Sequence, residues 1–442
     1  MSLSAAPSLH SGLIVAGTQS SSGKTAVVSL LLAALQRHHP VQPFKVGPDY
    51  IDPGYHFASA GVRSINLDSW IMGEAEVRRA AEEFTQHAWG IVEGVMGLFD
   101  GANADNTEGS TFELACWLNW PVVLVVPCAH SGRSIGATVR GFLQEAGPER
   151  ICGVILNGAS SPGHVDYLRR ACASWDIPLL GVLLKLPELD WPERHLGLQA
   201  STEQPLPTPQ QLAELAEAYL DVEALRSWLR PLPAPPAAPN IVVQPRKRIA
   251  LAQDEAFHFY YQANLAWLQV QGVEVVPFSP LHDETPPEAD GLILGGGFPE
   301  VFAETMAANT PLLRTLAEFI RSGMPCYAEC GGLMLLTESL ETQDGNHFSM
   351  AGVIPGSVAM TSCLQNFGYC HAQTDDGLRV RGHEFHYSRW REEAKHANAW
   401  TVTRHSTGSS RREGFRSETL HASYIHLHFP QAHALLKRLF QL

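Results

Sequence analysis

Two short stretches of this chain combine residue types that can do chemistry. Residues 17–25 (GTQSSSGKT) join glycines and serines to a Lys-Thr pair. Such a stretch can cradle phosphates with backbone N–H groups, add a lysine charge and offer a hydroxyl to Mg²⁺. Residues 329–332 (ECGG) place a cysteine where its thiol can act as a nucleophile. The first stretch predicts a nucleotide site, and the second predicts covalent catalysis by Cys330.

The phosphate-binding stretch has one residue more between Gly17 and Gly23 than the usual pattern GxxxxGK[ST]. An ordinary serine-rich turn is the alternative. We disfavour it because residues 12–17 (GLIVAG) predict a strand and residues 24–38 (KTAVVSLLLAALQRH) predict an amphipathic helix, which puts the loop at a helix N-terminus. The residues of this loop predicted to contact the nucleotide are Gly17, Thr18, Ser22, Gly23, Lys24 and Thr25.

Acidic residues near the ends of two further apolar runs are candidates for metal binding and catalysis. They occur in residues 44–56 (FKVGPDYIDPGYH) and 91–101 (IVEGVMGLFDG). The C-terminal ends of parallel strands share one edge of a sheet, so these side chains can converge on the phosphates, although each alone is typical of a solvated loop. Mg²⁺ prefers hard oxygen ligands. We predict metal binding by Thr25, Asp49 and Glu93, catalytic roles for Asp52 and Asp100, and a nucleotide contact by Lys45.

A further nucleotide contact is predicted for Asn157, which lies near the end of residues 153–158 (GVILNG). Its amide could recognise the base. A turn cap is an equally good interpretation of an asparagine at this place.

The elements that must position these residues follow a repeating pattern of apolar runs and longer helical segments. Such runs, buried on both faces, predict a parallel α/β sheet. Five prolines in residues 231–240 (PLPAPPAAPN) then break the periodicity. We predict a P-loop domain at 1–230, a linker at 231–246 and a second α/β domain at 247–442, which suits a chain of 442 residues.

Composition and charge limit the partners. The apolar fraction of 45% and the charged fraction of 17% are typical of a folded globular protein. The formal net charge of −14 argues against nucleic acid or a membrane surface, since both attract basic proteins. Eight cysteines without a CxxC pair indicate reduced thiols, and the first apolar run is too short for a signal peptide. We expect a cytoplasmic protein with a small-molecule substrate.

Residues 324–336 (MPCYAECGGLMLL) predict a nucleophile elbow, in which a strand turns sharply into a helix and presents Cys330. The N-terminus of the following helix favours the thiolate form. A buried structural cysteine is the alternative, and Cys326 in the same strand fits that description better. Backbone N–H groups of Gly296 and Gly331 are candidates for an oxyanion hole.

The base for this thiol is expected in residues 423–429 (SYIHLHF). Strand-like alternation would put His426 and His428 on the same face, so either can serve. The same histidines, with those of residues 382–386 (GHEFH), could instead bind a metal. That alternative is weaker because the HExxH spacing is missing.

These motifs resemble those of the cobyrinic acid a,c-diamide synthase family. In the first half the resemblance rests on GTQSSSGKT, FKVGPDYIDPGYH, VEGVMGLFDG, GVILNG and PERHLGL (192–198), and that half is similar to dethiobiotin synthetase. In the second half it rests on AFHFYY, GGGFPE, AECGGLM, GHEFHYS and SYIHLHF, which are similar to a class I glutamine amidotransferase domain. The resemblance covers residues 12–430 and implies a dethiobiotin-synthetase-like P-loop domain followed by a flavodoxin-like α/β domain.

The resemblance also implies a reaction. ATP with Mg²⁺ would phosphorylate the a and c acetates of a corrinoid tetracarboxylate-type substrate, and ammonia from L-glutamine would displace the phosphate. Cys330 would attack glutamine, and His426 matches the position of the base. Class I glutaminases usually follow that histidine with Pro-Glu, whereas Leu427-His428 follow it here, so the third triad member is absent or comes from elsewhere. Pro127 replaces an aspartate that is usual in the family.

Other hypotheses stay open at this point. One is an amidase for another tetrapyrrole, such as nickel-sirohydrochlorin or the substrate of the cobyric acid step. Another is a partitioning-type ATPase of the deviant P-loop class, and a third is a sensor with a decayed glutaminase. The sequence does not separate cobyrinate from hydrogenobyrinate, and it leaves the oligomeric state open, a homodimer included.

Overall fold

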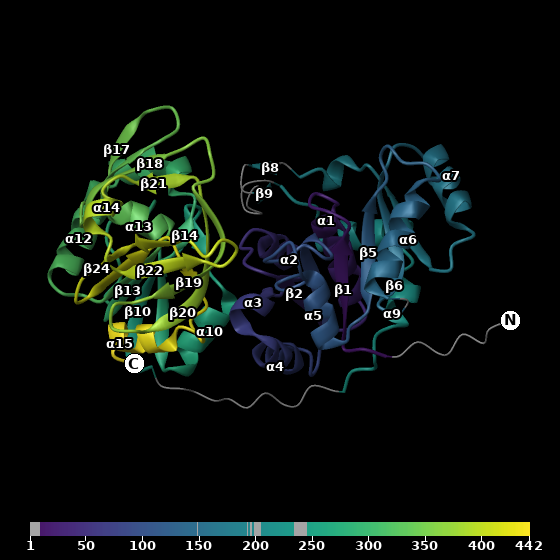
Figure 1. Ribbon diagram of the computed structural model, residues 1–442, viewed down its shortest axis with the longest axis horizontal. Helices are drawn as coiled ribbons and strands as arrows, with labels where there is room; N and C mark the ends of the chain where they lie inside the picture. The colour runs from purple at the N-terminus through teal and green to yellow at the C-terminus, as the bar shows by residue number, and fades with distance from the viewer. Residues whose placement is uncertain (1–8, 148, 192, 195–196, 199–204, 234–244) are drawn as a thin grey trace. The chain divides into compact units, whose positions relative to one another are not determined.

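The computed structural model describes residues 9–147, 149–191, 193–194, 197–198, 205–233 and 245–442 (Figure 1). The chain divides into two compact units, Met1–Pro239 and Asn240–Leu442. This division falls inside the predicted linker at 231–246, of which 234–244 lie outside the described residues. The PERHLGL stretch is also described only in part. Within the described residues, no helix combines the length and apolar character needed to cross a bilayer.

A parallel sheet forms the centre of the first unit (Figure 1, purple to teal). Its order is β3-β2-β4-β1-β5-β6-β7, and every strand pair in it is parallel. The strands are β1 (Gly12–Gly17), β2 (Val41–Val46), β3 (Ile65–Leu67), β4 (Trp89–Gly97), β5 (Val122–Pro127), β6 (Ile151–Ala159) and β7 (Leu179–Leu184). Apolar residues fill both faces of the central strands, as expected when helices cover both sides of a sheet. The predicted parallel α/β class is confirmed.

Helices join these strands and cover the sheet. They are α1 (Lys24–Gln36), α2 (Asp52–Ala60), α3 (Ser69–Met72), α4 (Glu74–Phe84), α5 (Thr111–Leu118), α6 (Ile135–Ala146), α7 (Pro162–Cys172), α8 (Pro209–Tyr219) and α9 (Val222–Arg226). A 3₁₀ turn, η1 (Pro187–Leu189), precedes the short strands β8 (Glu193–Arg194) and β9 (Gly197–Leu198).

The helix after the phosphate loop differs from the sequence prediction. An amphipathic helix was predicted at 24–38, but α1 is buried on nearly all sides, and Leu30, Leu31 and Leu32 are fully buried. The reason is that α1 packs between the sheet and α8, which contributes Leu212 to the same apolar cluster. A helix covered on both sides needs no polar face.

The second unit also has a mainly parallel sheet (Figure 1, green to yellow), in the order β12-β10-β13-β15-β25-β24 with β24 antiparallel at its edge. The strands are β10 (Lys247–Ala252), β12 (Val273–Phe278), β13 (Gly291–Leu294), β15 (Cys326–Glu329), β24 (Phe415–Arg416) and β25 (Leu420–Ser423). The helical segments are α10 (Gln262–Val270), η2 (Pro299–Phe302), α11 (Ala303–Ala308), α12 (Thr310–Arg321), α13 (Gly331–Leu336), α14 (Glu393–His396) and α15 (His433–Phe440).

Further strands extend this unit beyond the predicted flavodoxin-like pattern. A short pair joins β11 (Phe257–Phe259) to β14 (Gly296–Gly297). One additional sheet contains β16 (Thr337–Glu341), β17 (His347–Ser349), β18 (Ile354–Met360) and β21 (Ser388–Trp390). The other, antiparallel, contains β19 (Asn366–Gln373), β20 (Arg379–His386), β22 (Trp400–Arg404), β23 (Ser410–Glu413) and β26 (His426–Leu427). In it His383 pairs with His426, so this sheet positions the predicted base.

Candidate functional site

The phosphate loop connects β1 to α1, as predicted, and it is tightly packed. Gly23 has a φ of 86°, a left-handed conformation that favours glycine. A Cβ atom on Gly23 would lie 2.0 Å from Asn157 Nδ2, and one on Gly17 would lie 2.1 Å from Ser22 Oγ. Asn157 Nδ2 donates a hydrogen bond of 3.1 Å to the carbonyl of Ser22. The asparagine therefore braces the loop, and its predicted contact with the base stays a prediction.

Lys24 and Thr25 begin the helix at the end of this loop. Lys24 Nζ donates to the carbonyl oxygens of Met96 (2.7 Å) and Gln19 (3.2 Å). Burial, followed by the nearby charge of Lys45, lowers the pKa of Lys24 to about 8. Thr25 Oγ1 donates to the carboxylate of Glu93 over 2.8 Å. The two residues thus point toward the C-terminal half of β4.

Glu93 lies inside β4, whereas the sequence pattern predicts it near the end of that strand. The strand continues to Gly97, and in the register Glu93 stands beside Lys45 of β2. Both side chains are buried, and Lys45 Nζ lies 3.1 Å from Glu93 Oε1. Burial alone would raise the pKa of Glu93, but Lys45 and His56 hold it well below its usual range.

Lys45 is surrounded by carboxylates. Besides Glu93, its Nζ lies 2.5 Å from Asp52 Oδ2 and 3.6 Å from Asp49 Oδ2, and it donates to the carbonyl of Gly94 over 3.1 Å. Although burial opposes the effect, Asp52 and Glu93 raise the pKa of Lys45 well above its usual value. Burial and the charges of Asp49 and Glu93 raise the pKa of Asp52. Asp49, Asp52 and Glu93 therefore converge on the ammonium group of Lys45, whereas Asp100 is bonded to the N–H of Gly97 instead.

The predicted metal site stays a prediction. Three carboxylates share one lysine, and the Thr25 hydroxyl contacts one of them. In the part of the chain that the structure describes, no group of three or more His, Cys, Asp or Glu is arranged to hold a metal by itself. Mg²⁺ usually takes one or two carboxylates together with phosphate oxygens and water. Thr25 and Glu93 are therefore suited to a Mg²⁺ ion that arrives with a nucleotide.

Three other predicted residues stabilise nearby loops. Asp100 Oδ2 accepts a hydrogen bond from the N–H of Gly97 (2.8 Å), and Asp49 Oδ1 accepts those of Ile51 and Asp52. The N–H of Thr18 donates to the carbonyl of Val125 over 3.2 Å. Their predicted roles in catalysis, metal binding and nucleotide binding stay predictions.

Pro127, the departure from the family pattern, is the last residue of β5. In the register it pairs with Asn157, and the next residue, Cys128, donates its N–H to the carbonyl of Asn157 over 2.8 Å. The proline therefore ends the strand without interrupting the sheet.

His56 belongs to this site but was not singled out in the sequence. Its Nε2 lies 2.6 Å from Glu93 Oε2, its Nδ1 lies 3.0 Å from Ser64 Oγ, and the side chain is fully buried. It lies four residues after Asp52 in α2, so both share one helix face. The four-residue spacing of Asp52 and His56 in FKVGPDYIDPGYH could have indicated that His56 lies near the site.

Cys330 occupies the turn between β15 and α13, as predicted for a nucleophile elbow. Its φ of 47° and ψ of −100° are strained for a residue with a side chain. The N–H of Cys330 donates to the carbonyl of Ser423 over 2.7 Å, which anchors the turn to β25. Strain held by surrounding contacts is typical of a catalytic nucleophile at such a turn.

The two glycines predicted for the oxyanion hole lie next to this turn. A Cβ on Gly331 would lie 3.3 Å from the backbone nitrogen of Gly297, and one on Gly296 would lie 2.6 Å from His426 Cε1. The N–H of Gly295 is already bonded to the hydroxyl of Tyr260 over 2.9 Å. An oxyanion hole built from Gly296 and Gly331 stays a prediction that this close approach supports.

Of the two candidate bases, the structure brings His426 to the thiol. Although burial opposes the effect, contacts with Cys330 and Glu329 raise the pKa of His426 to about 10. Its ring also stacks on that of His383, with centroids 5.0 Å apart. His428 packs against the ring of Tyr261 with centroids 6.0 Å apart. The geometry favours His426 as the partner of the thiol.

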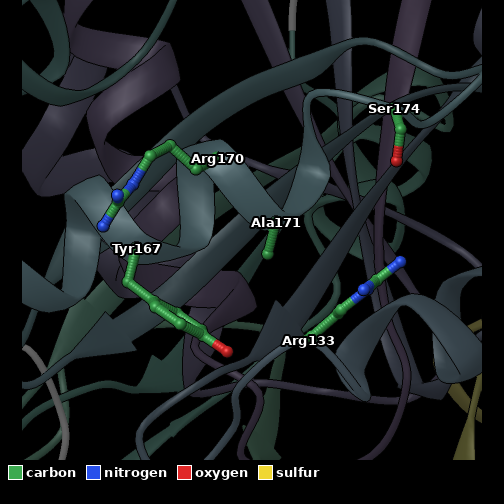
Figure 2. A pocket seen from close by; sticks show the side chains of 5 residues that line it. All are labelled: Arg133, Tyr167, Arg170, Ala171 and Ser174. Atoms are coloured by element: carbon green, nitrogen blue, oxygen red, sulfur yellow. The ribbon is translucent and has the colours of Figure 1, made fainter.

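A separate pocket lies at the ends of α6 and α7 (Figure 2). Its lining residues are Arg133, Tyr167, Arg170, Ala171 and Ser174. Figure 2 shows the two guanidinium groups pointing to different sides, so they do not converge on one ligand position. None of the residues predicted to carry chemistry lines it.

Comparison with known proteins agrees with a nucleotide site in the first unit and a glutaminase site in the second. Residues 13–198 match the CobQ/CobB/MinD/ParA nucleotide binding domain, and residues 248–434 match the CobB/CobQ-like glutamine amidotransferase domain. Relatives named cobyrinate a,c-diamide synthase occur in Syntrophotalea carbinolica and Dehalococcoides mccartyi, each 40% identical over 94% of this chain and 95% of its own. Another, in Priestia megaterium, is 41% identical over 94% of each chain. The chain therefore belongs to the cobyrinate a,c-diamide synthase family.

Proposed function

We propose that this protein is an ATP- and glutamine-dependent ligase that converts the a and c acetate side chains of cobyrinate into amides. The observation that carries the proposal is that relatives named for this activity align across about 94% of the chain. The two family matches, at 13–198 and 248–434, include the phosphate loop and Cys330. A partitioning-type ATPase would account for the match at 13–198 but not for the amidotransferase match at 248–434.

The first unit activates the acid. ATP binds at the phosphate loop, where Lys24 supplies a positive charge and the glycines allow close approach of the backbone. An acetate oxygen of the substrate attacks the γ-phosphorus of ATP, which gives an acyl phosphate and ADP. Mg²⁺ held by Thr25 and Glu93 would neutralise phosphate charge. The cluster around Lys45 keeps Glu93 in place for that role.

The second unit supplies ammonia. The Cys330 thiolate attacks the side-chain carbonyl carbon of glutamine, and the tetrahedral intermediate collapses to a thioester as the amide nitrogen leaves. The imidazolium of His426 gives its proton to that nitrogen, so neutral ammonia is released. Water then cleaves the thioester to glutamate and the thiol. Ammonia attacks the acyl phosphate, and inorganic phosphate leaves.

A mass-spectrometric end-point assay tests the substrate. The purified protein is incubated with ATP, Mg²⁺ and glutamine, and cobyrinate, hydrogenobyrinate and nickel-sirohydrochlorin are offered in parallel. We expect the diamide from cobyrinate. Diamide from hydrogenobyrinate alone would mean that the natural substrate contains no cobalt. ATP hydrolysis without any amide product would refute the proposed function.

A further inference from the structure

The two residues after the base do not complete a triad in this chain, because Leu427 and His428 follow His426. The structure places a carboxylate from a different part of the sequence beside the ring of His426. Glu329 Oε2 lies 3.3 Å from His426 Nδ1. Glu329 is the residue directly before Cys330, and it is 5% exposed.

The Glu329 carboxylate is held in position by its other oxygen. Oε1 accepts a hydrogen bond of 2.5 Å from the hydroxyl of Tyr327 and one of 3.0 Å from the N–H of Leu427. Tyr327 and Glu329 are two residues apart in β15, so they lie on the same face of the sheet. Leu427 is the residue after the base His426. The Glu329 carboxylate therefore contacts both the backbone of β26 and the imidazole ring that β26 carries. Oε2 is left facing the imidazole.

We propose that Glu329 is the positioning residue of the glutaminase, which orients the His426 ring and stabilises its imidazolium form while Cys330 reacts. This inference rests on the proposed function, since it assigns the missing third member of that catalytic group. Glu329 acts through His426 and is not expected to touch glutamine. Strand β15 thus ends with the residue that supports the base, and the nucleophile follows directly after it.

Among the residues that the structure describes, the other groups near the base do not offer a comparable negative charge. His383 stacks on the ring, and burial, with the nearby charge of His426, holds the pKa of His383 well below its usual range. Tyr261 contacts His383 Nδ1 at 3.4 Å and packs against His428. Cys330, the nucleophile, is a further hydrogen-bonding partner of the His426 ring. Glu329 is therefore the carboxylate that faces Nδ1, where a negative charge favours the protonated ring.

The test uses Glu329→Gln in the full-length protein. The amide has nearly the same shape and can still accept the hydrogen bonds of Tyr327 and Leu427, but it cannot stabilise an imidazolium by charge. We expect the kcat for glutamine hydrolysis to fall about 100-fold. We also expect the alkaline limb of the pH profile to move to lower pH, because the ring loses its proton more easily.

Two further variants separate positioning from general damage. Glu384→Gln alters another buried carboxylate, which pairs with Arg411 (2.5 Å) and lies 3.7 Å from His386 Nε2, so it should leave the alkaline limb in place. Glu329→Asp keeps the charge at a shorter reach, so its alkaline limb should stay closer to that of the wild type. A Glu329→Gln profile that superimposes on the wild-type profile would overturn the inference, as would an Asp variant shifted as far as the Gln variant.

The assay also separates this inference from the proposed function. Glutamine hydrolysis is measured without corrinoid, whereas amidation of cobyrinate is measured with added ammonia. If the wild type fails to amidate with ammonia but Glu329→Gln still shifts the alkaline limb, the substrate is wrong and the role of Glu329 stands. If amidation succeeds and the limb does not move, the proposed function stands and Glu329 has only a structural role.

Discussion

Lys45 Nζ lies 3.1 Å from Glu93 Oε1 between two adjacent parallel strands, and both side chains are buried. This ion pair connects the phosphate loop to helix α2, because Glu93 also contacts Thr25 and His56. We therefore expect this ion pair to affect nucleotide binding, the predicted metal site and the stability of the first unit.

Lys45→Met should strongly destabilise the first unit. The substitution leaves buried carboxylates without a cation, which typically costs about 3–5 kcal/mol of unfolding free energy. Urea unfolding followed by tryptophan fluorescence measures the loss. Lys185→Met is the matched control, because the ion pair of Lys185 with Asp190 is exposed and should contribute about 0–1 kcal/mol. Equal losses for both variants would contradict the buried network.

His56→Leu should weaken the response to Mg²⁺. The histidine holds Glu93 on the side away from Thr25, and loss of such a support typically weakens metal affinity about 10- to 100-fold. The half-saturating Mg²⁺ concentration for nucleotide binding, followed by calorimetry, gives the measurement. Ser64→Ala removes only the far hydrogen bond of the imidazole and should have a smaller effect. An unchanged Mg²⁺ dependence in His56→Leu would exclude this role.

Gly23→Ala should impair ATP binding. An added methyl group would meet the Asn157 amide at 2.0 Å, and the left-handed backbone adds about 1–2 kcal/mol. Gly61→Ala is the control, because that glycine also has a positive φ but its Cβ would enter open space. Combining Gly23→Ala with Asn157→Ala should restore part of the ATP affinity. If the double variant binds no better than the single one, the clash is not the cause.

ATP affinity should fall at alkaline pH. Because the pKa of Lys24 is lowered to about 8, the side chain of the free protein is charged below that pH and becomes neutral above it. Phosphate binds the charged form, so the Kd should be about tenfold weaker at about pH 9 than at pH 7. Calorimetric titrations across this range check the effect. Lys24→Arg stays charged and should show a flat profile; a falling affinity in that variant would point to another group.

The parts of the site that could be predicted from sequence are local ones. A glycine-rich loop between a strand and a helix, and a cysteine followed by two glycines, show their backbone geometry in a few consecutive residues. Gly23 and Cys330 accordingly have the left-handed or strained conformations that these turns require. The parallel sheet could be predicted for the same reason, because each buried strand appears as a short run of consecutive apolar residues.

The parts that could not be predicted depend on register between distant segments. Glu329 meets His426 across 97 positions of sequence, and His56 meets Glu93 only because β2, α2 and β4 pack side by side. Lys45 was predicted to contact the nucleotide, but its neighbours in space are carboxylates. The periodicity of apolar residues also does not predict that α8 covers α1, or that two additional sheets extend the second unit.

We propose that Cys330 only releases ammonia from glutamine, whereas the phosphate-loop unit makes the amide. The most direct measurement is amidation of cobyrinate by Cys330→Ala, with glutamine or with ammonium as the nitrogen source, beside Lys24→Ala. We predict that Cys330→Ala forms no amide from glutamine but forms the diamide from ammonium, and that Lys24→Ala still hydrolyses glutamine but forms no diamide from either source. Glutamine-dependent amidation by Cys330→Ala, or its failure with ammonium, would contradict these separate roles of the two units.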